Sequence, residues 1–561
     1  MKIKLIKSWL LFILLLLQVN SIEAQSLNEI IEAEKAYNDG KWTNATKLYE
    51  TLTRINAYNG MYWFRLGSSY YNLKQYEKST QAYLKSIELG QSLGYSMYNI
   101  ACNYALQNNA EQAVAWLIKA SGEKHGYNQQ SLLTDTDFDS IRESDVFKKI
   151  LAPAVISGIT REESWKKDLS YFDSQMRITH FNLFHTIYEE TWNKGINTIR
   201  DQITQTDDIH LNVMLMKLAS QVEDGHTSVY PSFGGQNPYH LLPIRISSFV
   251  EGDFIISSTK NYSTFLGAKI LKINDTSIED VKKQIGTILP IEKHNEQLVK
   301  SFGTYYLICL ELLYGLDIID AKSTVKLLIE QNNEIREITF SAPFTSFTPS
   351  DIVWGINKEM ENVIDSKNLP LYLKNSSEVF WYDYNPKNKL IYCQINQIKK
   401  KNGKSLGDLG KELRTLIDKK DVEVLVLDLR FNTGGNGFLN QDFVNEIIKC
   451  EQINTKGKLF TIIGPTTFSA AMLLSSELWL RTQTLFVGTP TGSSPNHIGD
   501  DNPHILPYSG LIFSASNAYW QSQSSYDFRK WIAPDIIAEP SFELLKQKRD
   551  PAMEAILKAL D

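Results

Sequence analysis

Four near-continuous apolar runs in the last third of the chain restrict its fold more than any other feature of the sequence. They are KLIYCQINQI, VEVLVLDLR, KLFTIIG and TLFVGTP, and helical patterns such as SLGDLGKELRTLID and SAAMLLSSELWL lie between them. Strands that are apolar on both faces and alternate with helices are typical of a parallel or mixed sheet covered by helices. The sequence therefore predicts an α/β domain within residues 346–561.

Three of these predicted strands run into unusual loops. FNTGGNG follows Arg430, PTTFSAA follows Gly464, and GTPTGSSPNHIGD follows Val487. Because ligands of such domains bind beyond the carboxyl ends of the strands, we expect the three loops to meet at one edge of the sheet and to carry the chemistry.

Ser469 is the candidate nucleophile of these loops. It stands between the strand KLFTIIG and the helix AAMLLSSELWL, so its hydroxyl can project into a cleft near a helix N-terminus. Serine at a helix start is also a common cap, and Thr466 and Thr467 could serve the same purpose. The position alone leaves both interpretations open.

Gly434 and Gly435 form the second candidate element. A glycine pair after a buried strand leaves backbone N–H groups free and allows close approach of a substrate backbone, so the loop can form an oxyanion hole. The alternative is a tight turn, with Asn432 and Asn436 as turn formers.

Taken together and in order, DLRFNTGGNG, PTTFSAA, VGTPTGSSPNHIGD and WIAPDI resemble the core blocks of the tail-specific, or C-terminal processing, peptidases. The closing stretch SFELLKQKRDPAMEAIL is also similar to that superfamily, and the resemblance covers roughly residues 162–561. It implies a serine peptidase that acts on peptide or protein substrates without a cofactor. It also implies a crotonase-like α/β core and a PDZ-like insertion.

The best-known branch of the superfamily uses a lysine about 25 residues after the nucleophile, and this sequence lacks it. That position is Ser494, and no lysine occurs between Lys458 and Lys530. A serine hydroxyl needs a base. The phrase LASQVEDGHTSVYP resembles the DGHT element of the tricorn-like and interphotoreceptor-retinoid-binding-protein-like branch, whose histidine is the general base. The resemblance assigns that role to His226, for which a turn residue after Gly225 is the alternative.

Five further positions complete the expected site, besides Gly434 and Gly435. Asp527, in QSSYDFRKWIAPD, is the candidate acid that orients His226, although a salt bridge to Arg529 or Lys530 is equally compatible with the sequence. The backbone N–H groups of Gly435 or Gly434 and of Ala470 are the expected oxyanion donors. Expected substrate-binding residues are Thr491, Gly492 and Gly267.

Two other polar groups are not assigned to catalysis. Asp428 and Arg430 flank a buried strand, and we expect them to form a structural pair. His497 could line the cleft, but no second histidine has the spacing of a metal site, so no metal is expected.

The residues before the core divide into two further modules. Residues 160–235 have helical periodicity and are expected to form the helical N-terminal module of the peptidase. Residues 236–345 contain short β-type runs around GAKILKINDTSIEDV, a phrase that resembles the strand and helix of a PDZ-like domain. A generic small β-rich module is the alternative.

Self-similarity with a period of 34 marks residues 26–155. Trp42, Tyr76 and Ala110 match, as do Ala33, Gly67 and Ala101, and Ala45, Ser79 and Ala113. Small residues at these offsets allow two helices to pack closely, while bulky residues fill the groove. The segment resembles three tetratricopeptide repeats with a cap and could bind a protein partner; an ordinary helical bundle is the alternative.

Residues 1–24 resemble a cleavable signal peptide. Lys2, Lys4 and Lys7 precede an apolar run from Trp9 to Val19, and small Ala24 precedes Gln25. The run is short for a bilayer span, so we expect export rather than an integral membrane protein, with a retained anchor as the alternative. Four scattered cysteines look like buried small hydrophobes. The net charge of −6, without a long basic block, argues against a nucleic-acid partner.

The sequence therefore predicts a multidomain, exported serine endopeptidase that works through an acyl-enzyme. The competing hypothesis is a catalytically inactive peptide-binding or scaffold protein of the cell envelope, because the lysine base is missing. A crotonase-like acyl-CoA enzyme would share the core but not the serine block.

Overall fold

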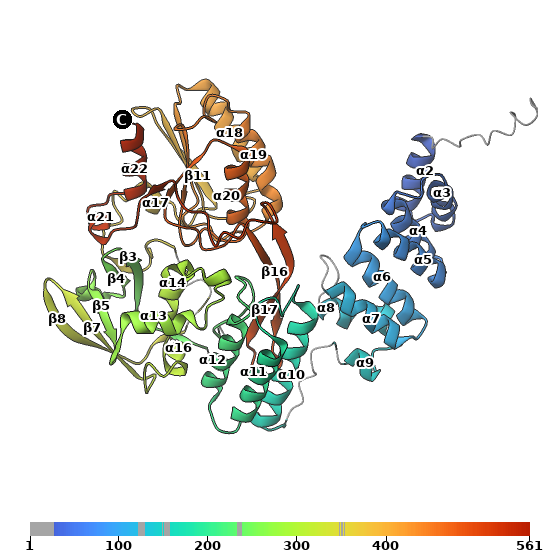
Figure 1. Cartoon of the computed structure of the whole chain (residues 1–561), viewed down its shortest axis with the longest axis horizontal. Coiled ribbons are helices and arrows are strands. Elements are labelled where there is room, and N and C mark those ends of the chain that lie inside the picture. Colours follow the sequence, from blue (N-terminus) through green and yellow to red (C-terminus); the bar gives the residue numbers. More distant parts are fainter. Residues whose placement is uncertain are drawn as a thin grey trace, which may run out of the picture. The chain divides into compact units, whose positions relative to one another are not determined.

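The computed structural model describes residues 27–121, 129–148, 150, 158–232, 238–346, 348, 352 and 354–560. The chain divides after Pro153 into two compact units, Met1–Pro153 and Ala154–Asp561 (Figure 1). The predicted signal peptide, residues 1–24, lies outside the described residues.

The first unit is helical and consists mainly of consecutive antiparallel helix pairs. Its helices are α2 (Leu27–Asn38), α3 (Trp42–Ile55), α4 (Gly60–Asn72), α5 (Tyr76–Glu88), α6 (Leu93–Leu106), α7 (Ala110–Ser121), α8 (Gln129–Thr134), η1 (Thr136–Phe138) and α9 (Asp145–Lys148). Trp42, Tyr76 and Ala110, which match at the period of 34, are the first residues of α3, α5 and α7. The sequence period is therefore the length of one helix pair.

Small residues set the separation of these helices. A Cβ atom on Gly67 would lie 2.9 Å from the ring of Tyr83, and the hydroxyl of Ser79 donates to the carbonyl of Gly67 at 2.8 Å. Tyr49 and Tyr83 are fully buried. The pairs of helices therefore pack as the alternation of small and bulky residues predicts.

A six-stranded mixed sheet, called here the core sheet, forms the centre of the second unit. Its order is β11-β12-β13-β14-β15-β18, antiparallel between β11 and β12 and parallel elsewhere. The strands are β11 (Phe380–Asn385), β12 (Leu390–Ile395), β13 (Val424–Asp428), β14 (Leu459–Ile463), β15 (Leu485–Gly488) and β18 (Ile536–Ile537). Strands β12 to β15 lie within the four apolar runs of the sequence.

Helices cover both faces of the core sheet, which explains why its strands are apolar throughout (Figure 1). One face, with Ile391, Leu425 and Leu427, packs against α18 (Leu406–Lys419), α19 (Asn440–Ile448) and α20 (Ala470–Arg481). The alternate residues of β12 and β13, such as Tyr392 and Val426, pack against α22 (Pro551–Leu560). Two shorter helices are α17 (Leu371–Lys374) and α21 (Phe542–Lys546), and η5 (Gly437–Leu439) precedes α19.

Residues 158–232 form three helices, α10 (Arg161–Thr179), α11 (Glu189–Gln202) and α12 (Asp208–Ser220), followed by the short strand β1 (Ser228–Val229). Strand β1 pairs with β17 (Ile512–Gln521), which pairs with β16 (Asn496–Ile505), in a sheet of order β1-β17-β16. Phe513 of β17 packs edge-on against Phe172 of α10, with ring centroids 5.0 Å apart. Residues 496–521 were expected to belong to the α/β core, whereas this hairpin packs against the helices of residues 160–235.

A second sheet contains most strands of residues 236–345. Its order is β10-β4-β5-β7-β8, with β3 beside β4 and β6 beside β5. The strands are β3 (Ile244–Phe249), β4 (Gly252–Ser258), β5 (Lys269–Ile273), β6 (Thr276–Ser277), β7 (Thr324–Gln331), β8 (Glu334–Ser341) and β10 (Glu361–Asn362), and β2 (His240–Leu241) pairs separately with β9 (Thr345–Ser346). The segment also holds η2 (Lys260–Phe265), α13 (Ile278–Gly286), η3 (Glu292–His294), α14 (Gln297–Ser301), α15 (Gly303–Tyr306) and α16 (Leu310–Gly315). These helices show that the segment is less purely β than its sequence indicates.

Two composition-based expectations can be compared with the structure directly. Cys102, Cys309, Cys393 and Cys450 are all buried and free, as expected for small apolar side chains. Among the described helices, none has the length and apolar character needed to cross a bilayer.

Candidate active site

Ser469 lies at the junction between β14 and α20, at the carboxyl edge of the core sheet. Its φ of +50° and ψ of −126° are unusual for a residue with a Cβ atom, and its half-buried side chain makes no capping bond to α20. The capping role considered from sequence is therefore not the one that Ser469 has. The hydroxyl remains available for another partner.

That partner is His226, which follows α12 in the chain. The Nε2 atom of His226 lies 2.9 Å from Oγ of Ser469, although 243 residues separate them in the sequence. The imidazole stacks on Phe468 with ring centroids 4.8 Å apart. A Cβ atom on Gly225 would lie 2.7 Å from the Phe468 ring, so the glycine of the DGHT phrase is required for this packing.

Gly434 and Gly435 lie against the same serine. A Cβ atom on Gly434 would lie 2.7 Å from Cβ of Ser469, and the φ angles of the pair, +113° and +133°, favour glycine. The N–H of Gly434 donates to Oδ1 of Asn432 at 2.9 Å, which leaves Gly435 as the glycine donor. In the described part of the chain, the N–H groups of Gly435 and Ala470 have no hydrogen-bond acceptor. Two free donors beside a serine hydroxyl can stabilise an oxyanion.

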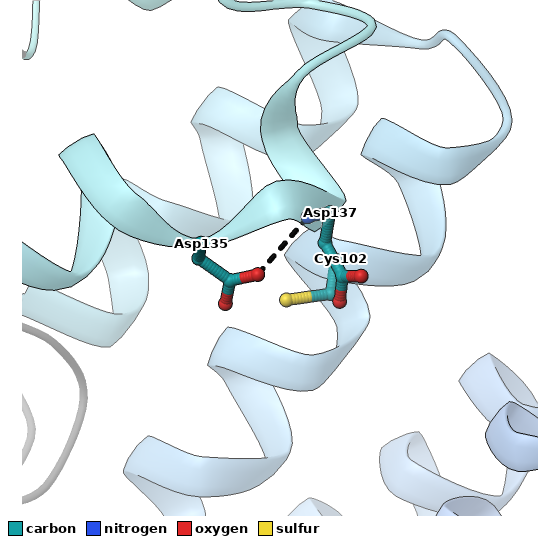
Figure 2. A group of neighbouring side chains, drawn as sticks. All are labelled: Cys102, Asp135 and Asp137. Atoms are coloured by element: carbon teal, nitrogen blue, oxygen red, sulfur yellow. Dashed lines mark hydrogen bonds between the residues drawn. The ribbon is translucent and has the colours of Figure 1, made fainter.

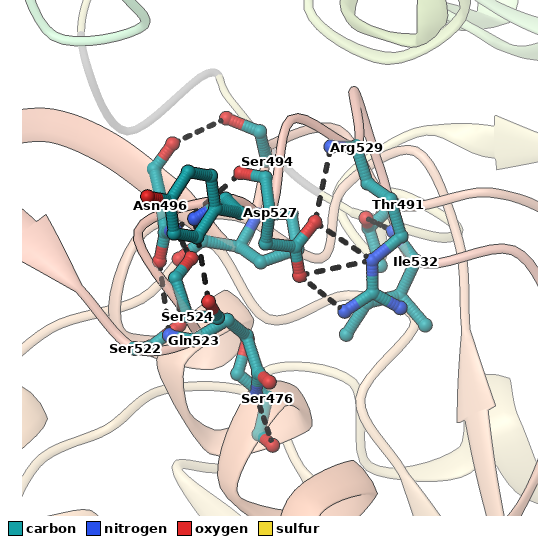
Figure 3. Close-up of polar contacts among 12 residues, drawn as sticks. Ser476, Thr491, Ser494, Asn496, Ser522, Gln523, Ser524, Asp527, Arg529 and Ile532 are labelled. Atoms are coloured by element: carbon teal, nitrogen blue, oxygen red, sulfur yellow. Dashed lines mark hydrogen bonds and ion pairs between the residues drawn. The ribbon is translucent and has the colours of Figure 1, made fainter.

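Asp527 does not make the expected contact with His226. Its carboxylate binds Arg529, with Nε of Arg529 at 3.0 Å from each oxygen, and the backbone N–H of Arg529 closes the turn (Figure 3). Nδ1 of His226 is buried and has no hydrogen-bond partner among the described residues. The salt bridge considered from sequence is the arrangement found. A neighbouring guanidinium two residues away satisfies the carboxylate locally.

Two of the three expected substrate-binding residues, Thr491 and Gly492, form hydrogen bonds between loops. The hydroxyl of Thr491 donates to the carbonyl of Ser493 at 2.9 Å. It also accepts the N–H of Ile532 at 2.9 Å (Figure 3). Gly492 donates its N–H to the carbonyl of Thr467 at 3.1 Å. Gly492 therefore joins the third loop to the loop that carries Ser469, and Thr491 joins it to Ile532.

Gly267 lies elsewhere, in the turn before β5. Its N–H donates to the carbonyl of Ile255 at 2.9 Å. A Cβ atom on Gly267 would contact Phe542 of α21 at 3.4 Å. The glycine thus packs beneath the C-terminal segment, and none of its recorded contacts is with Ser469 or His226.

No protein-family model and no curated protein matched the sequence. Solved structures are similar to it at low identity. Mature CPAF complexed with lactacystin is 11% identical with a TM-score of 0.48, over 71% of this chain and 98% of that one. The photosystem II D1 C-terminal processing protease is 12% identical with a TM-score of 0.32, over 72% and 97%. The tricorn protease is 11% identical with a TM-score of 0.34, over 71% and 36%.

All three similarities lie below 25% identity and below a TM-score of 0.5. The chemistry that this chain can perform is set by the side chains of its own site.

Two titratable groups near this site had no signal in the sequence. Glu292 is fully buried, and its carboxylate accepts the N–H of Ser494. Burial raises the pKa of Glu292 to about 7. Next to it, Lys293 donates to the carbonyl of Asn496 at 2.7 Å, and burial lowers the pKa of its amine. Both lie in the stretch IEKHN, which has no motif character.

His497 lines the site, as one reading of the sequence allowed. Its ring is parallel to that of His226, with centroids 5.8 Å apart. Burial, with the neighbouring His226 adding to the effect, lowers the pKa of His497 to about 3, so its ring is neutral at physiological pH. A neutral second imidazole therefore packs beside His226.

Asp428 and Arg430 form the structural pair expected from sequence. Nε of Arg430 donates to both oxygens of Asp428, at 3.0 and 2.9 Å, and its two terminal nitrogens donate to Asp550 at 2.9 Å each. The hydroxyl of Tyr392 donates to Asp428 at 2.5 Å. This buried network ties the end of β13 to the start of α22.

A separate polar cluster lies in the first unit. The Sγ atom of Cys102 and carboxylate oxygens of Asp135 and Asp137 lie within 4.8 Å of one another (Figure 2). The hydroxyl of Tyr98 donates to Asp135 at 2.6 Å, and that of Tyr71 donates to Asp137. Burial, with both carboxylates adding to the effect, raises the pKa of the Cys102 thiol. A protonated thiol beside two carboxylates already bonded to tyrosines is suited to packing rather than to metal binding.

Proposed function

We propose that this chain is a serine peptidase that hydrolyses peptide bonds through an acyl-enzyme. The observation that carries the proposal is the 2.9 Å separation between Oγ of Ser469 and Nε2 of His226. A separation of 2.6–3.2 Å between nucleophile and base is the range in which a proton can pass between them.

The mechanism follows from the atoms at the site. Oγ of Ser469 attacks the carbonyl carbon of the scissile bond while its proton passes to Nε2 of His226. The N–H groups of Gly435 and Ala470 stabilise the negative charge that develops on the carbonyl oxygen. The imidazolium then gives its proton to the leaving amine, and the acyl group remains on Ser469. A water molecule, deprotonated by His226, attacks the acyl carbon and releases the carboxylic acid and the free serine.

The finer assignment of the modules is part of the proposal. We assign residues 26–155 to tetratricopeptide-like repeats that bind a protein partner, residues 236–345 to a PDZ-like domain that recruits peptide by β-addition, and residues 346–561 to a crotonase-like core. The coincidence of the period of 34 with the starts of α3, α5 and α7 supports the first assignment.

Export is also proposed, on the N-terminal sequence alone. The basic start, the apolar run and Ala24 before Gln25 support cleavage after residue 24. N-terminal sequencing of the protein recovered outside the cytoplasm tests this point, and a mature chain that still begins at Met1 would contradict it.

A second candidate function is favoured by one observation. Nδ1 of His226 has no hydrogen-bond acceptor in the described structure, so the base lacks the carboxylate that usually orients it. A chain with this defect could bind peptides without cleaving them, as a peptide-binding or scaffold protein of the envelope.

Hydrolysis of an unstructured protein separates the two candidates. We expect fluorescein-labelled casein to be cleaved by the wild type and at least a hundred-fold more slowly by Ser469→Ala and His226→Ala. Ser475→Ala is the matched control, because its hydroxyl donates to the carbonyl of Ala471 within α20. Casein that is bound equally by all four proteins and cleaved by none would favour the scaffold protein.

A further inference from the structure

The carboxylate of Asp224, two residues before His226, takes part in four hydrogen bonds. It is 2% exposed. Its Oδ1 accepts the backbone N–H groups of His226 at 2.9 Å and Thr227 at 2.7 Å, and the hydroxyl of Ser516 at 2.6 Å. Its Oδ2 lies 2.6 Å from Nε2 of His180. Two of the four donors are therefore the backbone of the DGHT loop itself.

The two side-chain donors come from elements that are far apart in the sequence, α10 and β17. His180 is the C-cap residue of α10, and its Nδ1 accepts the N–H of Asn182 at 3.0 Å, so the ring proton lies on Nε2 and points to Asp224. Ser516 belongs to β17, and its N–H donates to Oγ1 of Thr227 at 3.0 Å. Asp224 thus connects the loop of His226 both to α10 and to the hairpin.

The bonds decide the charge of this buried group. Burial alone would raise the pKa of Asp224, but the hydrogen bonds from His180, Ser516 and Thr227 outweigh it and hold the pKa below its usual range. Asp224 is therefore an ionised carboxylate at neutral pH. Donors to an ionised acceptor form stronger bonds than neutral pairs, which makes the loop rigid.

In the described part of the chain, no carboxylate is hydrogen-bonded to the ring of His226. Nδ1 has no hydrogen-bond partner in the described structure, and the expected acid, Asp527, is bound to Arg529. The ring is held by stacking on Phe468 and by the position of its own backbone. The backbone of His226 is what Asp224 fixes.

We propose that Asp224, clamped between His180 and Ser516, is the positioning residue that aims Nε2 of His226 at Ser469. This inference rests on the proposed function for its catalytic consequence, but the geometry it describes exists independently of chemistry. The carboxylate acts through the backbone of the base and touches no reacting atom, so Asp224 and His180 are positioning residues rather than catalytic ones.

Replacement of His180 tests the hydrogen bond between His180 and Asp224 without removing the carboxylate of Asp224. His180→Leu deletes the donor to Asp224, whereas His180→Gln keeps an N–H donor on a side chain of similar reach. Rates of inactivation by a fluorophosphonate are measured as a function of its concentration, which separates the maximal rate, kinact, from the binding constant, KI. We expect His180→Leu to lower kinact at least ten-fold with KI within two-fold of the wild type. His180→Gln should lie within three-fold of the wild type.

A histidine beside the clamp is the matched control. The ring of His185 stacks on that of His180 at 5.9 Å, but its Nδ1 lies 2.8 Å from the carbonyl of Asn182 rather than near Asp224. We expect His185→Leu to leave kinact within two-fold of the wild type. An equal loss in His185→Leu and His180→Leu, or no rescue by His180→Gln, would mean that His180 only packs, and would overturn the proposal.

A second pair of variants covers the case in which His180→Leu does not fold. Ser516→Ala removes a donor to Asp224 with little change of volume, and Ser514→Ala is the same change on the same strand, at a residue whose hydroxyl donates to Tyr230. The expected result is a kinact at least three-fold lower for Ser516→Ala and unchanged for Ser514→Ala. Equal values for both variants and the wild type would overturn the proposal.

Amide exchange keeps this test separate from the proposed function. If the fluorophosphonate does not react with the wild type, the peptidase proposal fails, but the clamp is still measurable. The amides of His226 and Thr227 should exchange at least ten-fold faster in His180→Leu than in the wild type and His180→Gln. Equal exchange in all three proteins would show that the loop of His226 does not depend on the hydrogen bond between His180 and Asp224, and would overturn the proposal.

Discussion

Ser469 has a backbone conformation that a residue with a Cβ atom rarely adopts, with φ of +50°. Such strain, of order 1–3 kcal/mol, persists where surrounding structure enforces it, often at functional sites. We predict that Ser469→Gly raises the free energy of unfolding by about 1 kcal/mol and abolishes casein hydrolysis. Urea denaturation measures the first effect. Ser469→Ala keeps the Cβ atom and should abolish hydrolysis without the gain, so equal stability of the two variants would contradict the prediction.

Glu292 carries the clearest pH dependence of the site. Burial raises its pKa from 4.5 to about 7. Below pH 4.5 the carboxyl is neutral in the folded and unfolded chains, whereas between pH 4.5 and 7 the unfolded chain releases its proton first, so stability falls as the pH rises. We predict that Glu292→Gln is more stable than the wild type by about 1–3 kcal/mol at pH 8 and equally stable at pH 4.

Urea denaturation at pH 4, 6 and 8 measures this difference. The exposed carboxylate of Glu296, close in the chain, provides the control Glu296→Gln, for which we expect no pH-dependent gain. A gain for Glu292→Gln that is as large at pH 4 as at pH 8 would show that the buried carboxyl is not the cause.

At this scale the sequence indicated the two side chains of the proposed catalytic pair but not the residues that hold them in place. Ser469 and His226 stand in recognisable phrases, and their contact at 2.9 Å follows the expectation. The acid was misassigned, because the sequence cannot tell that the turn from Asp527 to Arg529 satisfies the carboxylate locally. Asp224 lies two residues before His226, in the same DGHT phrase. Its partners, His180 and Ser516, carry no motif and could not be found without the fold.

Among the elements, the start of α22 is held to the core sheet by an ion pair between side chains as well as by apolar packing. Asp550 binds the guanidinium of Arg430 through two bonds of 2.9 Å and is 7% exposed. Removing one partner of a buried pair leaves an uncompensated charge. We predict that Asp550→Ala lowers the free energy of unfolding by about 3 kcal/mol, measured by urea denaturation.

A neighbouring ion pair supplies the comparison. Glu554 of α22 binds Arg549 at the surface, where solvent screens the interaction, so Glu554→Ala should leave the urea midpoint unchanged. If Asp550→Ala had as little effect as Glu554→Ala, the network would not be what holds α22.

Elements of the core sheet were predictable, and the hairpin of β16 and β17 was not. Strands β12 to β15 are buried on both faces, so they appear as apolar runs whatever their neighbours are. Strand β16 contains NHIGDDNPHI, which has the glycine, asparagine and proline of a loop. Its status as a strand comes from pairing with β17, which in turn pairs with β1 from a part of the chain almost 300 residues earlier. Local patterns carry no record of such contacts.

At the scale of the molecule, every residue of the candidate site belongs to the unit Ala154–Asp561. We predict that a chain starting at Ala154 folds and hydrolyses casein at a rate within two-fold of the full-length protein. Circular dichroism and the casein assay measure this. The same truncated chain with Ser469→Ala is the control for contaminating protease. An unfolded or at least ten-fold slower truncated chain would show that the helical unit is required for the site.

The organisation of the first unit was also readable from sequence in part. The period of 34 residues predicted repeated helix pairs, and the matching residues Trp42, Tyr76 and Ala110 are the first residues of α3, α5 and α7. The period reports how helices pack against one another, so it carries no information about a binding partner.

The most direct test of the account is to find where a fluorophosphonate becomes attached. Intact-mass and peptide mass spectrometry of the full-length protein should give one adduct per chain, on the peptide that contains Ser469, and no adduct in His226→Ala under the same conditions. An adduct on another residue, or equal modification of the wild type and His226→Ala, would contradict the claim that this serine and this histidine act together.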